Sequence, residues 1–348
     1  MPAFVVKDSG LELNPTVLRW HLISQNISMK IKVAAGLLGM AFWSVSALAQ
    51  PFSLGLFGDT GYSRGELALV PDLIAEMDRE DLAFVIHDGD FKSGGSVCSD
   101  EVFRHMLQVF EASRHPLIYV PGDNEWTDCH RKNNGAYDPV ERLAKLREMF
   151  FSGATALGQR PLKLQRQSAD PKFAAYRENV RWETNGVIFV GMNVTGSQNN
   201  FHGASRNGGP VEEFLQRSVA NKAWLAQAFE RARQAKLAGL MLVIQANPLL
   251  EVFNEGKPVP GYTDFLTQLR VETLAFPGQV VLVHGDSHQQ QINQPLRDPA
   301  TQAVIRNFTR VETYGSPNMG WIKTTVDAKD AQVFRFEARP FRLPIAQP

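Results

Sequence analysis

The sequence has no surplus of charge of either sign, because 36 Lys and Arg residues are balanced by 36 Asp and Glu residues among 348. It therefore lacks the basic excess of a general nucleic-acid-binding protein, and we expect no nucleic-acid partner. It also lacks repeats with a period of about 20 to 50 residues, which excludes solenoid and fibrous classes. With 44% hydrophobic residues, the chain has the composition of a globular protein, and a small discrete ligand is the expected partner.

Long apolar runs are also missing, because no stretch reaches the roughly 18 uncharged apolar residues of a membrane-spanning helix. Residues 29–49 nevertheless have the layout of a secretory signal peptide: two early lysines, the apolar run 33–43, and small residues before a cleavage point after Ala49. We expect residues 1–28 to be an upstream extension from a misassigned start. Cleavage would give a periplasmic or secreted protein without a transmembrane anchor, and an uncleaved anchor is the alternative.

Cysteine is scarce, with only Cys98 and Cys129 present. Export to an oxidising compartment would allow these two to form a disulfide, which we predict. Closing a loop of about 30 residues would stabilise the fold by roughly 3 to 4 kcal/mol. Two free thiols are the alternative, whereas metal-binding cysteines are disfavoured because the spacing contains no CxxC.

Short apolar runs alternate with helical patterns, which is typical of strands joined by crossover helices. The expected strands are 52–57, 82–87, 117–120, 186–194, 240–245 and 280–284. The expected helices are 66–79, 100–113, 139–151, 211–236 and 263–274. The chain after Gln289 contains strand-like segments at 321–326 and 331–337 without intervening helices. We predict one α/β domain over 50–348 with a mixed or antiparallel second sheet, and a hairpin within 181–194 at Thr-Asn-Gly.

Four of the expected strands run into a Gly-Asp pair. These pairs carry Asp59, Asp90, Asp123 and Asp286. In an open α/β sheet the ligand lies beyond the carboxyl ends of the strands, so the four carboxylates should meet in one crevice. Because clustered carboxylates repel one another, bound cations are the simplest remedy. Two divalent ions sharing a carboxylate would clamp the attacking and the leaving oxygen of a phosphoryl transfer.

At this point the sequence resembles the calcineurin-like metallophosphoesterases, which include the purple acid phosphatases. Their motifs GDx(H/G), GDxx, GN(H)(D/E), a strand ending in His near Pro, and GHxH correspond in order to five blocks. These are GDTG at 58–61, GDFK at 89–92, GDNE at 122–125, QANP at 245–248 and GDSH at 285–288. The resemblance covers residues 51–290 and implies a layered β-sandwich with helices on both outer faces (αββα).

The resemblance also implies a metal centre. Asp59 and His288 would hold the first ion and Asp90 would bridge both. The complete expected ligand set is Asp59, Asp90, Asp123, Asn247, Asp286 and His288.

Several of the family's imidazole and phenol positions hold other residues here. Gly61 replaces the first-block histidine, Ser93 the tyrosine of the purple acid branch, and Ala246 the fourth-block histidine. Asp123 replaces the metal-binding asparagine, although a one-residue shift would make Asn124 the ligand. Because oxygen donors favour Mn²⁺ or Mg²⁺ over Fe or Zn²⁺, we expect a pair of Mn²⁺ or Mg²⁺ ions.

The proton donor is open, because Asn124 occupies the position of the histidine that helps to protonate the leaving group. We take Asn124 and His284 as catalytic candidates. The polar loop 195–210 could cover the substrate, with His202 and Arg206 available to a phosphate, or could be a surface insertion.

We therefore predict an exported, metal-dependent hydrolase of small phosphomonoesters or phosphodiesters, in which metal-bound hydroxide attacks phosphorus in line. The alternative is a catalytically impaired family member that binds metal or a phosphorylated ligand. A third possibility is a receptor for sugar or phosphate that uses no metal. Individually, the aspartates could also be turn or helix-cap residues.

Overall fold

A computed structural model describes residues 50–205 and 208–342. The expected upstream extension 1–28, the expected signal peptide 29–49 and Arg206 lie outside these residues. Within the described part of the chain, no helix is both long enough and apolar enough to cross a membrane.

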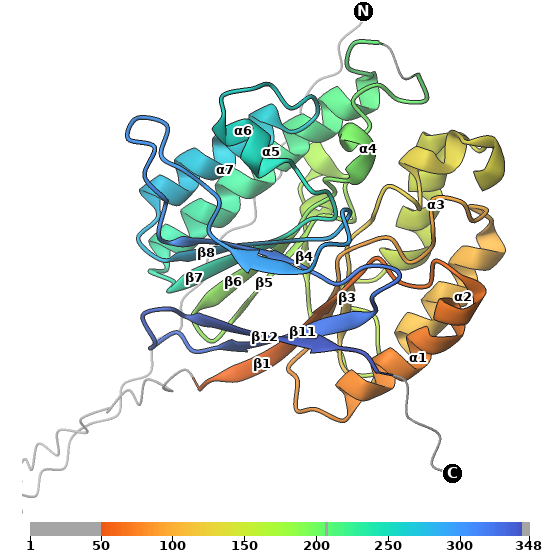
Figure 1. The fold of residues 1–348 in the computed structure, drawn as a ribbon, viewed down its shortest axis with the longest axis horizontal. Coiled ribbons are helices and arrows are strands. Elements are labelled where there is room, and N and C mark those ends of the chain that lie inside the picture. Colours follow the sequence, from red (N-terminus) through yellow and green to blue (C-terminus); the bar gives the residue numbers. More distant parts are fainter. Residues whose placement is uncertain (1–49, 206–207, 343–348) are drawn as a thin grey trace, which may run out of the picture. The chain divides into compact units, whose positions relative to one another are not determined.

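The first sheet has five strands in the order β12-β11-β1-β2-β3. Their bounds are β1 (Phe52–Phe57), β2 (Val85–His87), β3 (Leu117–Tyr119), β11 (Gly320–Val326) and β12 (Phe334–Pro340). Strands β1, β2 and β3 are parallel to one another, and β11 pairs antiparallel with β1. Figure 1 shows three helices beside this sheet, α1 (Arg64–Asp78), α2 (Asp100–Glu111) and α3 (Pro139–Phe150).

The second sheet has seven strands in the order β4-β5-β6-β7-β8-β10-β9. Their bounds are β4 (Gln165–Arg166), β5 (Val180–Thr184), β6 (Val187–Gly191), β7 (Gly239–Val243), β8 (Gln279–His284), β9 (Gln291–Asn293) and β10 (Phe308–Glu312). The α-helices that follow β6 and β7 are α4 (Gly196–Asn199), α5 (Glu212–Gln234), α6 (Leu250–Asn254) and α7 (Thr263–Ala275). Short 3₁₀ helices lie at 127–130, 132–134, 167–169 and 171–173.

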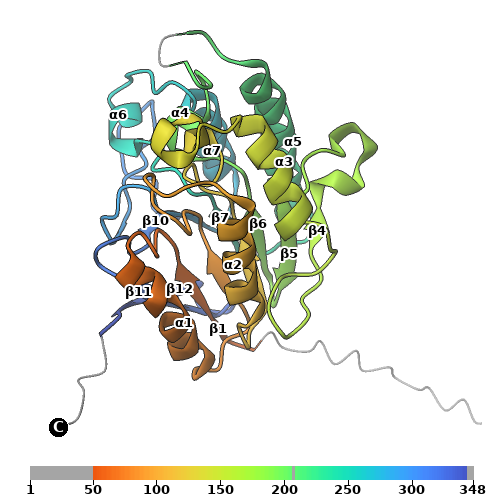
Figure 2. The ribbon, with the colours of Figure 1, turned by 90° about the vertical axis from the view of Figure 1, so that its right-hand side faces the viewer.

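Three apolar layers hold these elements together, and the two-residue period of each strand decides which layer a side chain enters. On β6, Val187 and Phe189 point into the layer between the two sheets, while Ile188 and Val190 point toward α5 and α7. On β1, Leu54 and Leu56 enter the layer between the sheets, while Phe57 packs against the helices of the first sheet. Helix, sheet, sheet and helix therefore form four layers, which confirms the expected αββα class (Figure 2).

Local sequence explains where the elements begin and turn. Helix α1 begins after Ser63, whose hydroxyl accepts the Glu66 amide, and α3 begins after Asp138. The expected hairpin joins β5 and β6, and Asn185 and Gly186 supply the positive φ values that its two-residue turn requires.

The segments after Gln289 do not form a sheet of their own. Strands β9 and β10 extend the second sheet, and β11 and β12 extend the first, so that both sheets are mixed. The expected segment 331–337 corresponds to β12, which begins three residues later at Phe334.

Candidate active site

The candidate site forms where strands of both sheets end at the same edge of the molecule. Asp59, Asp90 and Asp123 follow β1, β2 and β3 of the first sheet, and Asp286 follows β8 of the second. We call these four residues the carboxylate cluster. The backbone N–H of Asp286 donates to both carboxylate oxygens of Asp59, at 3.1 and 3.2 Å, which joins the two sheets at the cluster.

Left-handed backbone places three of these side chains. The φ values of Asp59, Asp90 and Asp286 are 48°, 58° and 75°. Non-glycine residues adopt this region at a cost of about 1 to 3 kcal/mol, and such strain is concentrated at functional sites. The adjoining glycines are also required, since a Cβ at Gly285 would lie 1.8 Å from Asp59 Oδ2. In each Gly-Asp pair, the glycine therefore permits close contact with a neighbouring segment, and in three of the pairs the aspartate adopts the left-handed conformation that turns the chain.

On one side of the cluster, Asp59 contacts an imidazole and a phenol. His288 Nε2 lies 3.3 Å from Asp59 Oδ1, and His288 Nδ1 lies 2.7 Å from the carbonyl of Ser316. The contact with Asp59 raises the pKa of His288 to about 9. The Tyr62 hydroxyl donates to Asp90 Oδ2 at 2.8 Å and lies 3.3 Å from Asp59. The phenol thus spans the two carboxylates of β1 and β2.

Asp90 lies at the centre of the site and is held by Asn124. The backbone N–H of Asn124 donates to Asp90 Oδ1 at 3.1 Å, and its Nδ2 donates to Asp90 Oδ2 at 2.6 Å. Beneath Asp90, the buried Glu125 accepts the amides of Phe91, Asp90 and Gly122, which fixes the turn after β2. Burial raises the pKa of Glu125 to about 7.

On the other side of the cluster, the buried Gln245 connects Asp123 to Asp286. Its Nε2 lies 3.2 Å from Asp123 Oδ1 and 3.4 Å from Asp286 Oδ1. Ser197 Oγ lies 2.8 Å from Asp123 Oδ2 and 2.7 Å from Asp128 Oδ1. Because one hydroxyl has one proton, it can donate to only one of these carboxylates. Burial and the nearby Asp123 raise the pKa of Asp128 to about 6, which brings its protonation closer to neutral pH.

Uncompensated negative charge is the main electrostatic property of the site. Burial raises the pKa values of Asp59, Asp90 and Asp286, and the neighbouring carboxylates raise them further. Lys92 is the buried cation beside Asp90, and its Nζ donates to the carbonyl of Asn124 at 2.6 Å. Burial lowers the pKa of Lys92, although the surrounding carboxylates oppose this shift. Bound cations would relieve the repulsion among the ionised carboxylates.

The site fits divalent ions by the chemistry of its donors. The cluster offers hard oxygen ligands, and the Ser316 carbonyl orients His288 so that Nε2 faces the cluster, which is how metal-binding imidazoles are held. In the part of the chain that the structure describes, no three His, Cys, Asp or Glu side chains already surround one point as ligands. Their oxygens are instead bonded by Tyr62, Asn124 and Gln245.

Three other predicted site residues point elsewhere. The side chain of Asn247 donates to Ser287 Oγ at 2.8 Å, and only its backbone N–H contacts Asp286. His284 is buried, its Nδ1 lies 2.9 Å from the Gly285 carbonyl, and its charged neighbours are outside the cluster. His202 Nδ1 lies 2.6 Å from the carbonyl of Gly208 in its own loop.

Besides Ser197 of the polar loop, the sequence alone assigned no role to two further residues that contact the cluster directly. Tyr62 belongs to the first block, GDTGY, and Gln245 to the fourth, QANP. In both blocks the family's histidine position is the neighbouring residue, Gly61 or Ala246. A polar side chain one place from the expected ligand was the available signal.

The predicted disulfide between Cys98 and Cys129 is confirmed, with Cα atoms 5.8 Å apart. Both sulfurs lie near the carbonyl of Asn124. The bond therefore ties the loop after Asp90 to the loop after Asp123.

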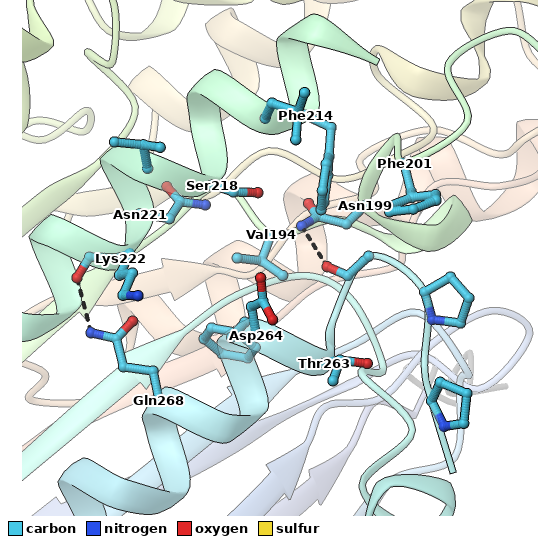
Figure 3. Close-up of a pocket in the computed structure, with 16 residues that line it drawn as sticks. Val194, Asn199, Phe201, Phe214, Ser218, Asn221, Lys222, Thr263, Asp264 and Gln268 are labelled. Carbon is cyan, nitrogen blue, oxygen red and sulfur yellow. Dashed lines mark hydrogen bonds between the residues drawn. The ribbon is translucent and has the colours of Figure 1, made fainter. Parts of the chain in front are cut away.

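A separate cavity of about 550 Å³ lies between α5 and α7 (Figure 3). Its walls are largely apolar and include Val194, Phe201 and Phe214, and among the described residues Asp264 is the single carboxylate that lines it. Asn199 borders the cavity and belongs to the same left-handed turn as Ser197, which contacts the cluster.

No protein-family model matches the sequence, and no curated protein is similar to it. Solved structures do match. A dimetal phosphatase from Danio rerio superposes with a TM-score of 0.50 at 13% identity, over 83% of this chain and 96% of that one. PhoD superposes with a TM-score of 0.51 at 11% identity, over 80% of this chain and 64% of PhoD. At these identities the likeness establishes the fold.

Proposed function

The chain has the fold of the calcineurin-like metallophosphoesterases, and from this premise we propose that it is a metal-dependent hydrolase of phosphate esters. The observation that carries the proposal is the convergence of Asp59, Asp90, Asp123 and Asp286 from both sheets on one edge. Among the described residues, these four carboxylates outnumber the cationic groups beside them, Lys92 and His288, and divalent ions would supply the balance.

The cofactor in this proposal is a pair of Mn²⁺ or Mg²⁺ ions. Asp59, Asp90 and His288 would hold one ion, and Asp90, Asp123 and Asp286 the other, while Asn247 would act on Asp286 through its backbone N–H. Hard oxygen donors favour these ions over Zn²⁺ or Fe. When bound, such ions polarise phosphoryl oxygens and lower the pKa of water.

The chain's own polar groups would orient the ester. Asn124 Nδ2 holds Asp90 and adjoins the Tyr62 hydroxyl at 3.0 Å, so both groups face the centre of the cluster. Burial and the nearby carboxylates raise the pKa of Tyr62 well above its usual range, which keeps the phenol protonated at neutral pH. Tyr62 would therefore donate a hydrogen bond to a phosphoryl or leaving oxygen, where charge develops during the reaction.

We further propose that the protein is exported and acts on small phosphorylated substrates, monoesters or diesters. The disulfide between Cys98 and Cys129 supports an oxidising compartment, because such bonds are rare in the cytosol. Amino-terminal sequencing of protein from fractionated cells tests this point. We expect the mature chain to begin at Gln50, and a cytosolic chain with an intact leader would contradict export.

The activity is tested on chelator-treated protein supplied separately with Mn²⁺, Mg²⁺, Zn²⁺ and Ca²⁺, using a chromogenic phosphomonoester and a phosphodiester. We expect Mn²⁺ or Mg²⁺ to restore turnover in the wild type but not in Asp90→Asn. Asp81→Asn, an exposed aspartate away from the cluster, is the matched control and should retain full activity. Absence of turnover with every ion in folded protein, or full activity in Asp90→Asn, would refute the proposal.

A further inference from the structure

Gln245 occupies a position between two carboxylates that no metal ion can share with it. Its side chain is fully buried, two residues after the end of β7. Its Nε2 faces one carboxylate from each sheet, Asp123 at 3.2 Å and Asp286 at 3.4 Å. An amide N–H₂ group donates hydrogen bonds to carboxylates and is not itself a metal ligand in this orientation.

The orientation of this amide is fixed by its other end. Gln245 Oε1 accepts the backbone N–H of Gly196 at 2.6 Å. Exchanging the two ends would place the amide nitrogen against that N–H and the oxygen against the two carboxylates, so that three favourable contacts would become unfavourable. The stem is held as well, since a Cβ on Gly89 would lie 2.5 Å from Gln245 Cγ.

Among the described residues, no side-chain amide bonds the Asp59 carboxylate. Asp59 contacts His288 Nε2 and the Tyr62 hydroxyl. His288 Nε2 becomes a metal ligand when it loses its proton. The buried Asn124 amide bonds Asp90, the carboxylate that both ions would share, so this contact opposes both ions alike. Beside Asp123 and Asp286, an ion must in addition break the hydrogen bonds of Gln245.

We propose that Gln245 makes the two metal positions unequal. The ion held by Asp59, Asp90 and His288 binds first and tightly. The ion held by Asp123 and Asp286 binds weakly, because it competes with the Gln245 amide for the same carboxylate oxygens. This inference rests on the proposed function for the presence of two metal positions, and it assigns to one residue the difference in affinity between them.

Isothermal titration of the chelator-treated full chain with Mn²⁺, without substrate, tests the inference. We expect one tight event and a second event weaker by about 10- to 100-fold, the range over which residues that contact metal ligands change affinity. Gln245→Glu keeps an oxygen for the Gly196 N–H and places another oxygen toward Asp123 and Asp286. This variant should strengthen the second event at least tenfold and leave the first unchanged.

Gln268→Glu is the matched control, because it adds the same charge on α7 and should change neither event. Where Gln245→Glu does not fold, as judged by circular dichroism, Gln245→Ala takes its place, since removing the amide also frees the two carboxylates. Two events of equal affinity in the wild type would overturn the inference, as would an unchanged or weaker second event in the Gln245 variants.

Failure of this inference and failure of the proposed function have different signatures. Unequal Mn²⁺ binding without ester hydrolysis would support the role of Gln245 and refute the enzyme. Equal Mn²⁺ binding at both positions together with ester hydrolysis would refute the role of Gln245 and support the enzyme. Thermal unfolding of the metal-free protein adds a readout independent of turnover, since Gln245→Ala leaves the Gly196 N–H without its partner and should lower the melting temperature.

Discussion

Replacing Glu125 by glutamine should change the stability of the metal-free protein by an amount that depends on pH. Burial raises the pKa of this carboxyl from 4.5 to about 7, against the opposing influence of Lys92. A raised native pKa gives stability that is fully present below pH 4.5 and is lost as the pH rises through about 7. At about 1.4 kcal/mol per pH unit, wild-type protein should lose roughly 2 to 3 kcal/mol from this group between pH 5 and pH 8.

The substituted amide would be neutral throughout, so Glu125→Gln should gain that amount relative to the wild type on going from pH 5 to pH 8. The assay is urea unfolding in chelator at both pH values. Buried His87 and His284, whose pKa values burial lowers, also affect stability below pH 6.5. They are present in both proteins, so their effects cancel in the difference.

The readout is the change between the two pH values and not the absolute stability of Glu125→Gln. The new amide nitrogen would face the N–H groups of Gly122 and Asp90, and this contact between donors lowers stability at both pH values. The exposed Glu111→Gln at the end of α2 serves as the control, and its effect should be the same at both pH values. A Glu125→Gln effect that stays constant within about 0.5 kcal/mol, or that changes in the opposite direction, would refute the reasoning.

Three further outcomes are expected. Replacing both Cys98 and Cys129 by serine should lower the free energy of unfolding by roughly 3 to 4 kcal/mol, measured in urea, and an unchanged midpoint would contradict it. Tyr62→Phe should stay folded by circular dichroism but lose about 100-fold in kcat on the phosphomonoester, whereas full activity would remove the phenol from the mechanism. Arg217→Met should cost about 3 to 5 kcal/mol in urea unfolding, because the fully buried guanidinium bonds Glu213 and the backbone of the left-handed turn. The half-exposed Arg231→Met is its control and should cost under about 1 kcal/mol, so equal losses would show that burial is not the cause.

The sequence carried most of the fold, because strand alternation and Gly-Asp turns are local. The residues of β1, β6 and β8 alternate between two apolar layers, and this pattern is visible without a structure. The sequence did not predict which sheet each of the last four strands would join. Val326 of β11 pairs with Phe52, which lies near the other end of the described sequence. An antiparallel strand can be added beside either sheet without a change in its own pattern.

The candidate site was predictable in part for the same reason. Asp59, Asp90 and Asp286 stand at strand ends, where topology alone brings them to one edge. The role of Gln245 depends on the Gly196 N–H from a distant loop, which fixes the direction of its amide. Asn247 was predicted as a ligand, but its side chain donates to Ser287 and only its backbone N–H contacts the cluster, at Asp286.

The carboxylate cluster also bears on how the domain is assembled. Asp59, Asp90 and Asp123 belong to one sheet, while Gln245 and Asp286 belong to the other, so the site does not exist until the two sheets have docked. A cation that binds carboxylates of both sheets would stabilise only the docked state, by mass action. Ion supply would then act on the yield of folded protein as well as on its chemistry.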